Sequence, residues 1–333
     1  MRMIQKERIQ WLAILRGLNI LLVVMVHVQL VDMSTGQNHS FCNALSFPFH
    51  PIRMPLFIFI SGGLLYLSRI RKEISTKALY KDKFQRIMIP FVFFVIVYFL
   101  IKATFNQFTK TPIDLSWSNF LESFVYYRGH SSQPLWFLAV LMFLMLMYPL
   151  FCYLCKNKYR MIAFLIFCCG IYFIDTDLDS RWNVFYIMEI QHYLVFFFFG
   201  IFFFRFELYK FIGNIGILLV LVLLYAACYY FSLGLPTSII GIFMMCSLCL
   251  KIGEYLPNLF SSFREYIFQI YLMSLPFQTF VELILWKHYF YNEKLVFLFY
   301  IINLLFGLFI PVIISKLVER CNIKFVRLCF GLQ

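Results

Sequence analysis

Two side chains with the chemistry of a catalytic site lie inside the first apolar stretch of the sequence. The stretch ILRGLNILLVVMVHV, residues 14–28, carries Arg16 and His27. Ionisable side chains are costly at membrane depth and usually have a function there. An imidazole titrates near neutrality and can act as a general base, and a guanidinium can hold a phosphate or a carboxylate. The stretch therefore combines a base with a cation.

The spacing of these two residues suits a helix. They are eleven positions apart, and at about 100° per residue this turns a helix about 20° past three full turns. Both side chains are expected on one face, ~16 Å apart along the axis. Taken singly, Arg16 could reach the lipid headgroups and His27 could make one interhelical hydrogen bond. Together on one face they indicate that this face lines a path for a substrate through the membrane domain.

The composition is that of a polytopic membrane protein. Of 333 residues, 62% are hydrophobic and 14% are charged, against about 25% charged in soluble domains. A span needs about 20 apolar residues. We expect an all-α bundle of about ten transmembrane helices. The expected spans are residues 11–31, 47–67, 87–105, 134–154, 159–175, 187–206, 212–231, 236–251, 265–286 and 295–315. The eighth is short and could be broken or tilted.

The basic residues support this topology. With the N-terminus in the cytoplasm, 21 of the 29 Lys and Arg residues fall on the cytoplasmic side and 6 on the other. Both termini are therefore expected in the cytoplasm, and the net charge of +13 reflects membrane topology rather than nucleic-acid binding. The ten cysteines lie mostly in apolar runs, where packing explains them better than a metal site, and we expect no metal.

Several stretches follow one another in an order known from one family. Arg16 and His27 give Arg-x10-His, and MPLFIFISGGLLY begins at Met54. The others are KFQRIMIP (83–90), PLWFLAVLMFLMLMYPLF (134–151), YLVFFFFGIFFF (193–204) and IYLMSLP (270–276). The series resembles the acyltransferase family 3 membrane enzymes along nearly the whole chain. The resemblance implies a single membrane domain over residues 1–333.

The resemblance also implies roles for residues. The family moves acyl groups, often acetyl, from a cytoplasmic donor to a sugar hydroxyl or a related acceptor. His27 would be the general base or would accept the acyl group itself. Arg16, Lys83 and Arg86 would hold the phosphates of an acyl-CoA donor, with no permanently bound cofactor. Lys83 stands where the family commonly has arginine, and Ser274 where many members have histidine.

Four further residues are candidates for lining a pocket. Ser61, in FISGG, either orients a group in the path or packs between helices. Trp136 either walls an acceptor or acyl pocket or belongs to the core. Arg53 could pair with an anionic acceptor, with lipid phosphate or with Asp32. Asp32 follows His27 by five residues, a turn of about 500°, so the two share a face only if the helix ends between them.

We therefore expect a membrane O-acyltransferase acting on a cell-surface or lipid-linked carbohydrate, by resemblance in a bacterial inner membrane. Its partners would be acyl-CoA, the glycan and membrane lipid, with no nucleic acid. The longest outer loop, residues 106–133, is rich in Tyr, Trp and polar residues, as carbohydrate surfaces and interfacial aromatic belts both are. The alternatives are a transporter of a small metabolite or glycan precursor, and a noncatalytic scaffold. Paired inverted repeats, which many transporters show, are not visible.

Overall fold

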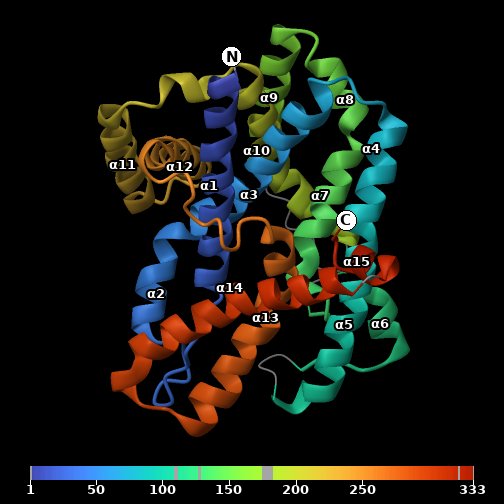
Figure 1. The fold of residues 1–333 in the computed structure, drawn as a ribbon, viewed down its shortest axis with the longest axis vertical. Coiled ribbons are helices and arrows are strands. Elements are labelled where there is room, and N and C mark those ends of the chain that lie inside the picture. Colours follow the sequence, from blue (N-terminus) through green and yellow to red (C-terminus); the bar gives the residue numbers. More distant parts are fainter. Residues whose placement is uncertain (1, 109–111, 127–128, 175–182, 322, 333) are drawn as a thin grey trace. The chain divides into compact units, whose positions relative to one another are not determined.

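The protein is all-helical throughout the part that the structure describes. The computed structural model covers residues 2–108, 112–126, 129–174, 183–321 and 323–332 (Figure 1). Within these ranges there is no strand, only an isolated bridge between Val31 and Asn38. The chain forms two compact units, the first from residues 1–60 and 206–316 and the second from residues 61–205 and 317–333.

Many helices are long and apolar enough to cross a membrane. In the described ranges six helices meet this criterion, and a bent pair makes a seventh if it is one span. The six are Ser40–Ile70, Thr76–Phe105, Ile187–Arg205, Leu235–Tyr255, Ile267–Tyr289 and Glu293–Arg320, and the pair is Gln133–Leu146 with Tyr148–Leu154. Each of the ten expected spans overlaps a helix, although residue 175 of the fifth lies outside the described residues. The number of crossings stays a prediction.

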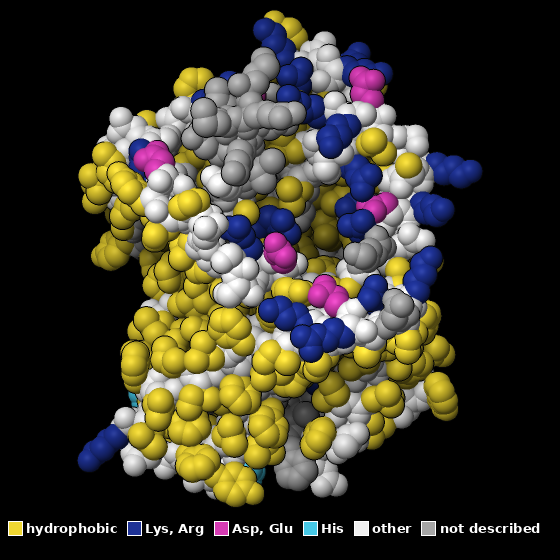
Figure 2. Space-filling view, in the orientation of Figure 1, with side chains coloured by type: hydrophobic (Ala, Val, Ile, Leu, Met, Phe, Trp, Pro, Cys, Tyr) yellow, Lys and Arg dark blue, Asp and Glu magenta, His cyan; other side chains and the backbone are white. Residues whose placement is uncertain are grey.

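One apolar helix that is shorter than these six, α11 (Ile215–Tyr230), also has an apolar surface: its Leu219 and Leu223 are 61% and 72% exposed. Figure 2 shows hydrophobic side chains gathered over this helix, at the left. Soluble proteins rarely expose such patches, whereas lipid covers them at no cost. Apolar helices with apolar outer faces define an integral membrane protein.

The first unit is arranged around its N-terminal helix. α1 packs against α12 and α13, and α11 packs against α12. Gly241 lets α12 approach α3 closely, because a Cβ there would lie 2.6 Å from the side chain of Ile52. The helices of this unit are α1 (Arg2–Val26), α2 (Ser40–Ser46), the first part of α3 (His50–Leu65), α11, α12 (Leu235–Tyr255), α13 (Ile267–Phe280) with its π-helical extension Val281–Tyr289, and most of α14 (Val296–Arg320).

The second unit is arranged around a phenylalanine-rich helix. α10 packs against α9 and α7, and α15 packs against α5, where the rings of Phe94 and Phe330 lie 5.5 Å apart. Two π-helical stretches, Tyr66–Ile70 and Phe84–Met88, follow α3 and α4. The helices of this unit are α4 (Thr76–Lys83), α5 (Ile89–Phe105), α6 (Trp117–Glu122), α7 (Trp136–Leu146), α8 (Tyr148–Leu154), α9 (Lys158–Tyr172), α10 (Ile187–Arg205) and α15 (Lys324–Cys329).

The first helix is shorter at its far end than the sequence predicts. α1 ends at Val26, whereas the expected span runs to residue 31. The backbone beyond it has other partners: Leu30 N–H donates to Asn38 Oδ1 at 2.8 Å, and Trp286 Nε1 donates to Val31 O at 2.8 Å. These bonds replace the helical ladder, so the chain unwinds directly after Val26.

Two other spans also differ from expectation. The span expected at 134–154 bends by 52° between α7 and α8. Pro149 lies at the start of α8, where it has no N–H to donate and its ring clashes with the preceding turn. The span expected at 236–251 is neither short nor broken, because α12 runs over 21 residues from Leu235 to Tyr255.

The FISGG segment of α3 packs closely against α10 through its two glycines. A Cβ on Gly62 would lie 2.0 Å from the carbonyl oxygen of Phe197, and one on Gly63 would lie 2.3 Å from the ring of Phe204. Both partners belong to α10. The two glycines therefore allow close approach of these helices, as small residues do in membrane proteins.

Replacing one of these glycines tests the contact. Gly62→Ala is expected to destabilise the protein by about 1–3 kcal/mol or more, because the clash is with backbone that cannot rotate away. The thermal midpoint in detergent measures the loss. Gly170→Ala on α9 is the matched control, because nothing lies within 4 Å of a Cβ there. Equal midpoints for the two variants would contradict the close packing.

Candidate active site

His27 lies in the turn that ends α1. Its backbone N–H donates to Val24 O at 3.1 Å, and that of Val28 donates to Met25 O at 3.1 Å, so the last turn tightens before the chain extends. The side chain of His27 is half-buried, and within the described residues its ring nitrogens make no hydrogen bond. A ring in this state can still accept a hydrogen bond from a substrate hydroxyl.

The electrostatic neighbours of His27 are His50 and Arg53, at the start of α3. An imidazole and a guanidinium that interact electrostatically supply a base and an anion-binding group to the first unit. This pairing could serve acyl transfer, in which a hydroxyl loses its proton and a carbonyl oxygen becomes negative. The structure thus brings together two of the residues that the sequence analysis selected.

Asn19 fixes Arg53 relative to α1, and the sequence analysis missed it. With its amide oriented to satisfy both groups, Asn19 donates to Arg53 O at 3.0 Å and accepts from Phe57 N at 3.3 Å. The asparagine is 1% exposed. A signal was available, because Asn19 is polar, lies in an apolar run and falls within about 80° of Arg16 and His27 on the helical wheel.

Asp32 is engaged elsewhere. Its carboxylate accepts from Ser34 N and Ser34 Oγ at 2.8 and 2.7 Å, and from Tyr291 Oη at 3.2 Å. The Ser34 hydroxyl is the main reason that the pKa of Asp32 is below its usual value. The helix does end between His27 and Asp32, yet His27 is not among the hydrogen-bond partners of this carboxylate in the described structure.

The second unit holds a cluster of cations around one carboxylate. Asp82 Oδ2 lies 2.8 Å from Arg69 Nη2, and Asp82 Oδ1 lies 2.8 Å from Arg86 Nε. Lys83 Nζ is 3.9 Å from the same carboxylate. Arg69 and Arg86 each lie in a π-helical stretch, a feature often found at functional sites. Three cations share one anion, so the cluster keeps a positive charge. Figure 2 shows Lys and Arg side chains along the side where α4 runs, at the right.

The remaining selected residues are distributed over the two units. Arg16 is half-buried on α1 in the first unit, whereas Lys83 and Arg86 belong to the second. Ser61 is half-buried directly before the packed glycine pair. Trp136, at the start of α7, packs on Tyr193 of α10 with ring centroids 5.2 Å apart. Two of the motif stretches therefore meet in the second unit.

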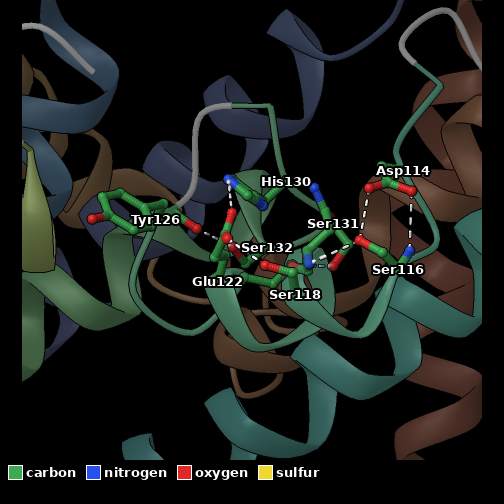
Figure 3. A network of polar contacts seen from close by, with 10 residues as sticks. Asp114, Ser116, Ser118, Glu122, Tyr126, His130, Ser131 and Ser132 are labelled. Carbon is green, nitrogen blue, oxygen red and sulfur yellow. Dashed lines mark hydrogen bonds and ion pairs between the residues drawn. The ribbon is translucent and has the colours of Figure 1, made fainter. Parts of the chain in front are cut away.

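The described part of the loop at residues 112–133 carries a polar network that the sequence did not reveal in detail. Figure 3 shows His130 facing Glu122, with Nε2 4.0 Å from the carboxylate, while Ser118 Oγ donates to Glu122 at 2.7 Å. The ring of Tyr126 stacks on His130. Ser132 Oγ donates to Tyr126 O at 3.0 Å. The network orders an aromatic and polar surface; Arg128 of the same loop lies outside the described residues.

Potential metal-ligating side chains do not form a cluster in the described part of the structure. Among those residues no group of three or more His, Cys, Asp or Glu side chains is arranged to hold a metal ion. The chemistry at hand is that of an imidazole, guanidiniums and hydroxyls, which suits proton transfer and anion binding.

Comparison with known proteins places the chain in a family. The family model described as an acyltransferase domain, acyltransferase 3, matches residues 9–316. A search of curated proteins and a search of solved structures found no significant match. An integral membrane acyltransferase is the class that these findings define. The chain belongs to the acyltransferase 3 family, and the resemblance seen in its motifs is confirmed. It is a transferase of groups other than aminoacyl groups.

Neutralising Asp82 tests whether the cation cluster is a structural unit. Asp82→Asn leaves Arg69 and Arg86 without their anion while they are still partly buried, so we expect stability to fall by about 1–3 kcal/mol. Thermal unfolding in detergent measures this. The control is Glu254→Gln, which removes an exposed ion pair with Lys251 and should shift stability by less than about 0.5 kcal/mol. A cluster without structural importance would give the two variants the same midpoint.

Proposed function

We propose that the protein is a membrane O-acyltransferase that moves an acyl group, most simply acetyl, from cytoplasmic acyl-CoA to a hydroxyl of a cell-surface or lipid-linked carbohydrate. The observation that carries the proposal is the family match over nearly the whole chain, with His27 at the unwound end of α1 as its available base. The proposed setting is the inner membrane of a bacterium, with ten spans and both termini in the cytoplasm.

In the proposed reaction His27 takes the proton of the acceptor hydroxyl. The oxygen then attacks the thioester carbonyl of acyl-CoA, and the tetrahedral intermediate carries a negative oxygen that Arg53 can stabilise. Its collapse forms the ester and breaks the C–S bond, and the CoA thiolate takes up the proton from His27. Alternatively His27 attacks first and holds the acyl group before the acceptor arrives.

In the second unit, Lys83 and Arg86 are proposed to hold phosphates of the donor; in the first unit, Arg16 is proposed as a separate anion-binding residue. CoA carries several phosphates, and arginine can hold a phosphate with two parallel hydrogen bonds. Arg86 is the best placed of the second-unit cations because its side chain is 53% exposed while its Nε–H is anchored by Asp82. The guanidinium is thereby oriented with donors left over for a ligand.

In the second unit, Ser61 and Trp136 are proposed to contact the acceptor; in the first unit, Arg53 and Asp32 are proposed as polar groups of their own. Aromatic rings pack on the apolar faces of sugars, and Trp136 with Tyr193 offers such a surface. Arg53 and Asp32 could bind charged or hydroxyl groups of the acceptor. The Tyr126–His130 surface of the outer loop supports a carbohydrate ligand in the same way.

The first test is the acyl content of surface glycans in cells. We expect ester-linked acyl groups, measured by proton NMR, to vanish in a deletion strain and in His27→Ala, because both remove the proposed general base. The control is His288→Ala, an exposed histidine of the first unit, which should retain the full signal at equal protein level.

The same experiment separates the competing functions. Loss of the signal in the deletion strain but not in His27→Ala would contradict the catalytic role of His27 and favour a transporter or scaffold. A transporter would give saturable, proton-dependent uptake into proteoliposomes without an acyl product.

A binding measurement tests the donor site. We expect Arg86→Gln to raise the dissociation constant of the purified protein for CoA about tenfold, because a charged hydrogen bond to phosphate is lost. Isothermal titration calorimetry would measure it. The matched control is Arg71→Gln, which removes the same charge from an exposed position of the same unit. If both variants raise the dissociation constant equally, Arg86 has no specific role, and the positive charge of this region attracts CoA only in a general way.

A further inference from the structure

A hydrogen bond from α13 closes the turn that carries His27. Gln278 Nε2 donates to Val24 O at 2.9 Å, and this carbonyl also accepts the backbone N–H of His27 at 3.1 Å. The carbonyl that ends the helical ladder of α1 is thus shared between the candidate base and a side chain 254 positions away. Gln278 is 1% exposed and Val24 is fully buried.

Gln278 is itself held tightly by α14. Asn303 Nδ2 donates to the backbone O of Gln278 at 3.2 Å. Gly307 makes room for the glutamine, because a Cβ there would lie 2.8 Å from both Gln278 Cδ and Val24 Cγ1. The amide therefore has little freedom to leave the Val24 carbonyl, and α1, α13 and α14 are joined at this point.

The other flank of His27 is fixed from the same stretch of chain. Trp286 Nε1 donates to Val31 O at 2.8 Å. In the sequence, His27 therefore lies between Val24 and Val31. The carbonyl of each accepts a hydrogen bond from a buried side chain of the same segment, Gln278 for Val24 and Trp286 for Val31. A helix end otherwise leaves its last carbonyls without partners, and away from water each such group is costly.

We propose that Gln278 is a positioning residue for His27. Its amide fixes the Val24 carbonyl, the carbonyl fixes the turn, and the turn sets where the imidazole points. This inference rests on the proposed function only for the importance of His27, because the positioning itself can be measured without a substrate. Catalytic groups need a locked geometry, and a displacement of about 1 Å can cost about 10²-fold in rate.

The test compares three variants. Gln278→Met keeps the length of the side chain and removes the donor. Gln278→Glu keeps the length, and a buried neutral carboxyl still offers one O–H donor. Thr237→Val is the control, because it deletes a bond of the same kind, from Thr237 Oγ1 to Cys228 O at 3.1 Å, in the same unit but between α12 and α11 and not to α1.

Hydrogen exchange of the purified protein is the primary measurement. We expect the amides of His27 and Val28 to exchange at least about tenfold faster in Gln278→Met, to recover much of their protection in Gln278→Glu and to be unchanged in Thr237→Val. Wild-type exchange at His27 in Gln278→Met, or faster exchange there in Thr237→Val as well, would overturn the proposal.

The acyl content of surface glycans then links position to function. At equal amounts of folded protein, Gln278→Met should lose most of the ester signal, Gln278→Glu should restore part of it, and Thr237→Val should keep it. If His27→Ala keeps the signal, the proposed function fails while the exchange result still stands. If His27→Ala loses it and Gln278→Met does not, the positioning role fails alone.

Discussion

The hydrocarbon core of a bilayer offers no water to backbone polar groups, and this constraint governs the whole molecule. A continuous helix satisfies its own N–H and C=O groups, so long helices dominate. Wherever a helix is interrupted, another part of the protein must supply the missing partner. At the end of α1 the partners are Asn38, Gln278 and Trp286. At the bend before α8, Tyr80 Oη donates to Leu146 O, a carbonyl left free near Pro149.

Three of the residues with chemistry lie at such interruptions. His27 follows the end of α1, and Arg69 and Arg86 occupy π-helical stretches. An irregular backbone points side chains in directions that a regular helix cannot, and each irregularity needs a stabilising contact. This explains why a candidate site residue such as His27 is accompanied by buried amides and indoles that touch no substrate themselves.

Local patterns in the sequence were sufficient for the helical character and for the choice of some candidate site residues. Apolar runs located the helices, and the Arg-x10-His spacing selected Arg16 and His27. The adjacent glycines of FISGG are a sequence signal for close helix packing, and their partners on α10 leave no room for a Cβ. Asp82 was also within reach, since an acidic residue four positions before Arg86 is a standard helical pairing.

What the sequence could not give is the set of long-range partners. The end of α1 was placed five residues too late because the bonds that unwind it come from Trp286 and from Asn38, which apolar periodicity does not register. Asn19 and Gln278 were missed for the same reason, since a buried amide gains its meaning only from the carbonyl it reaches. Which carbonyl a buried amide binds is decided by the fold and not by the local sequence.

The π-helical stretch Phe84–Met88 sets the rotation of everything that follows it in α5. Downstream, Val92, Ile96 and Leu100 form an exposed stripe, while Phe91, Phe94, Val95 and Tyr98 are buried. A π turn holds about one residue more than an α turn. Loss of one residue here would therefore restore regular winding and leave the lipid-facing and protein-facing stripes of α5 in place, whereas loss of one residue within α5 would rotate everything after it by about 100°. The π-helical stretch is thus the point at which this connection can change its length without turning the helix that follows.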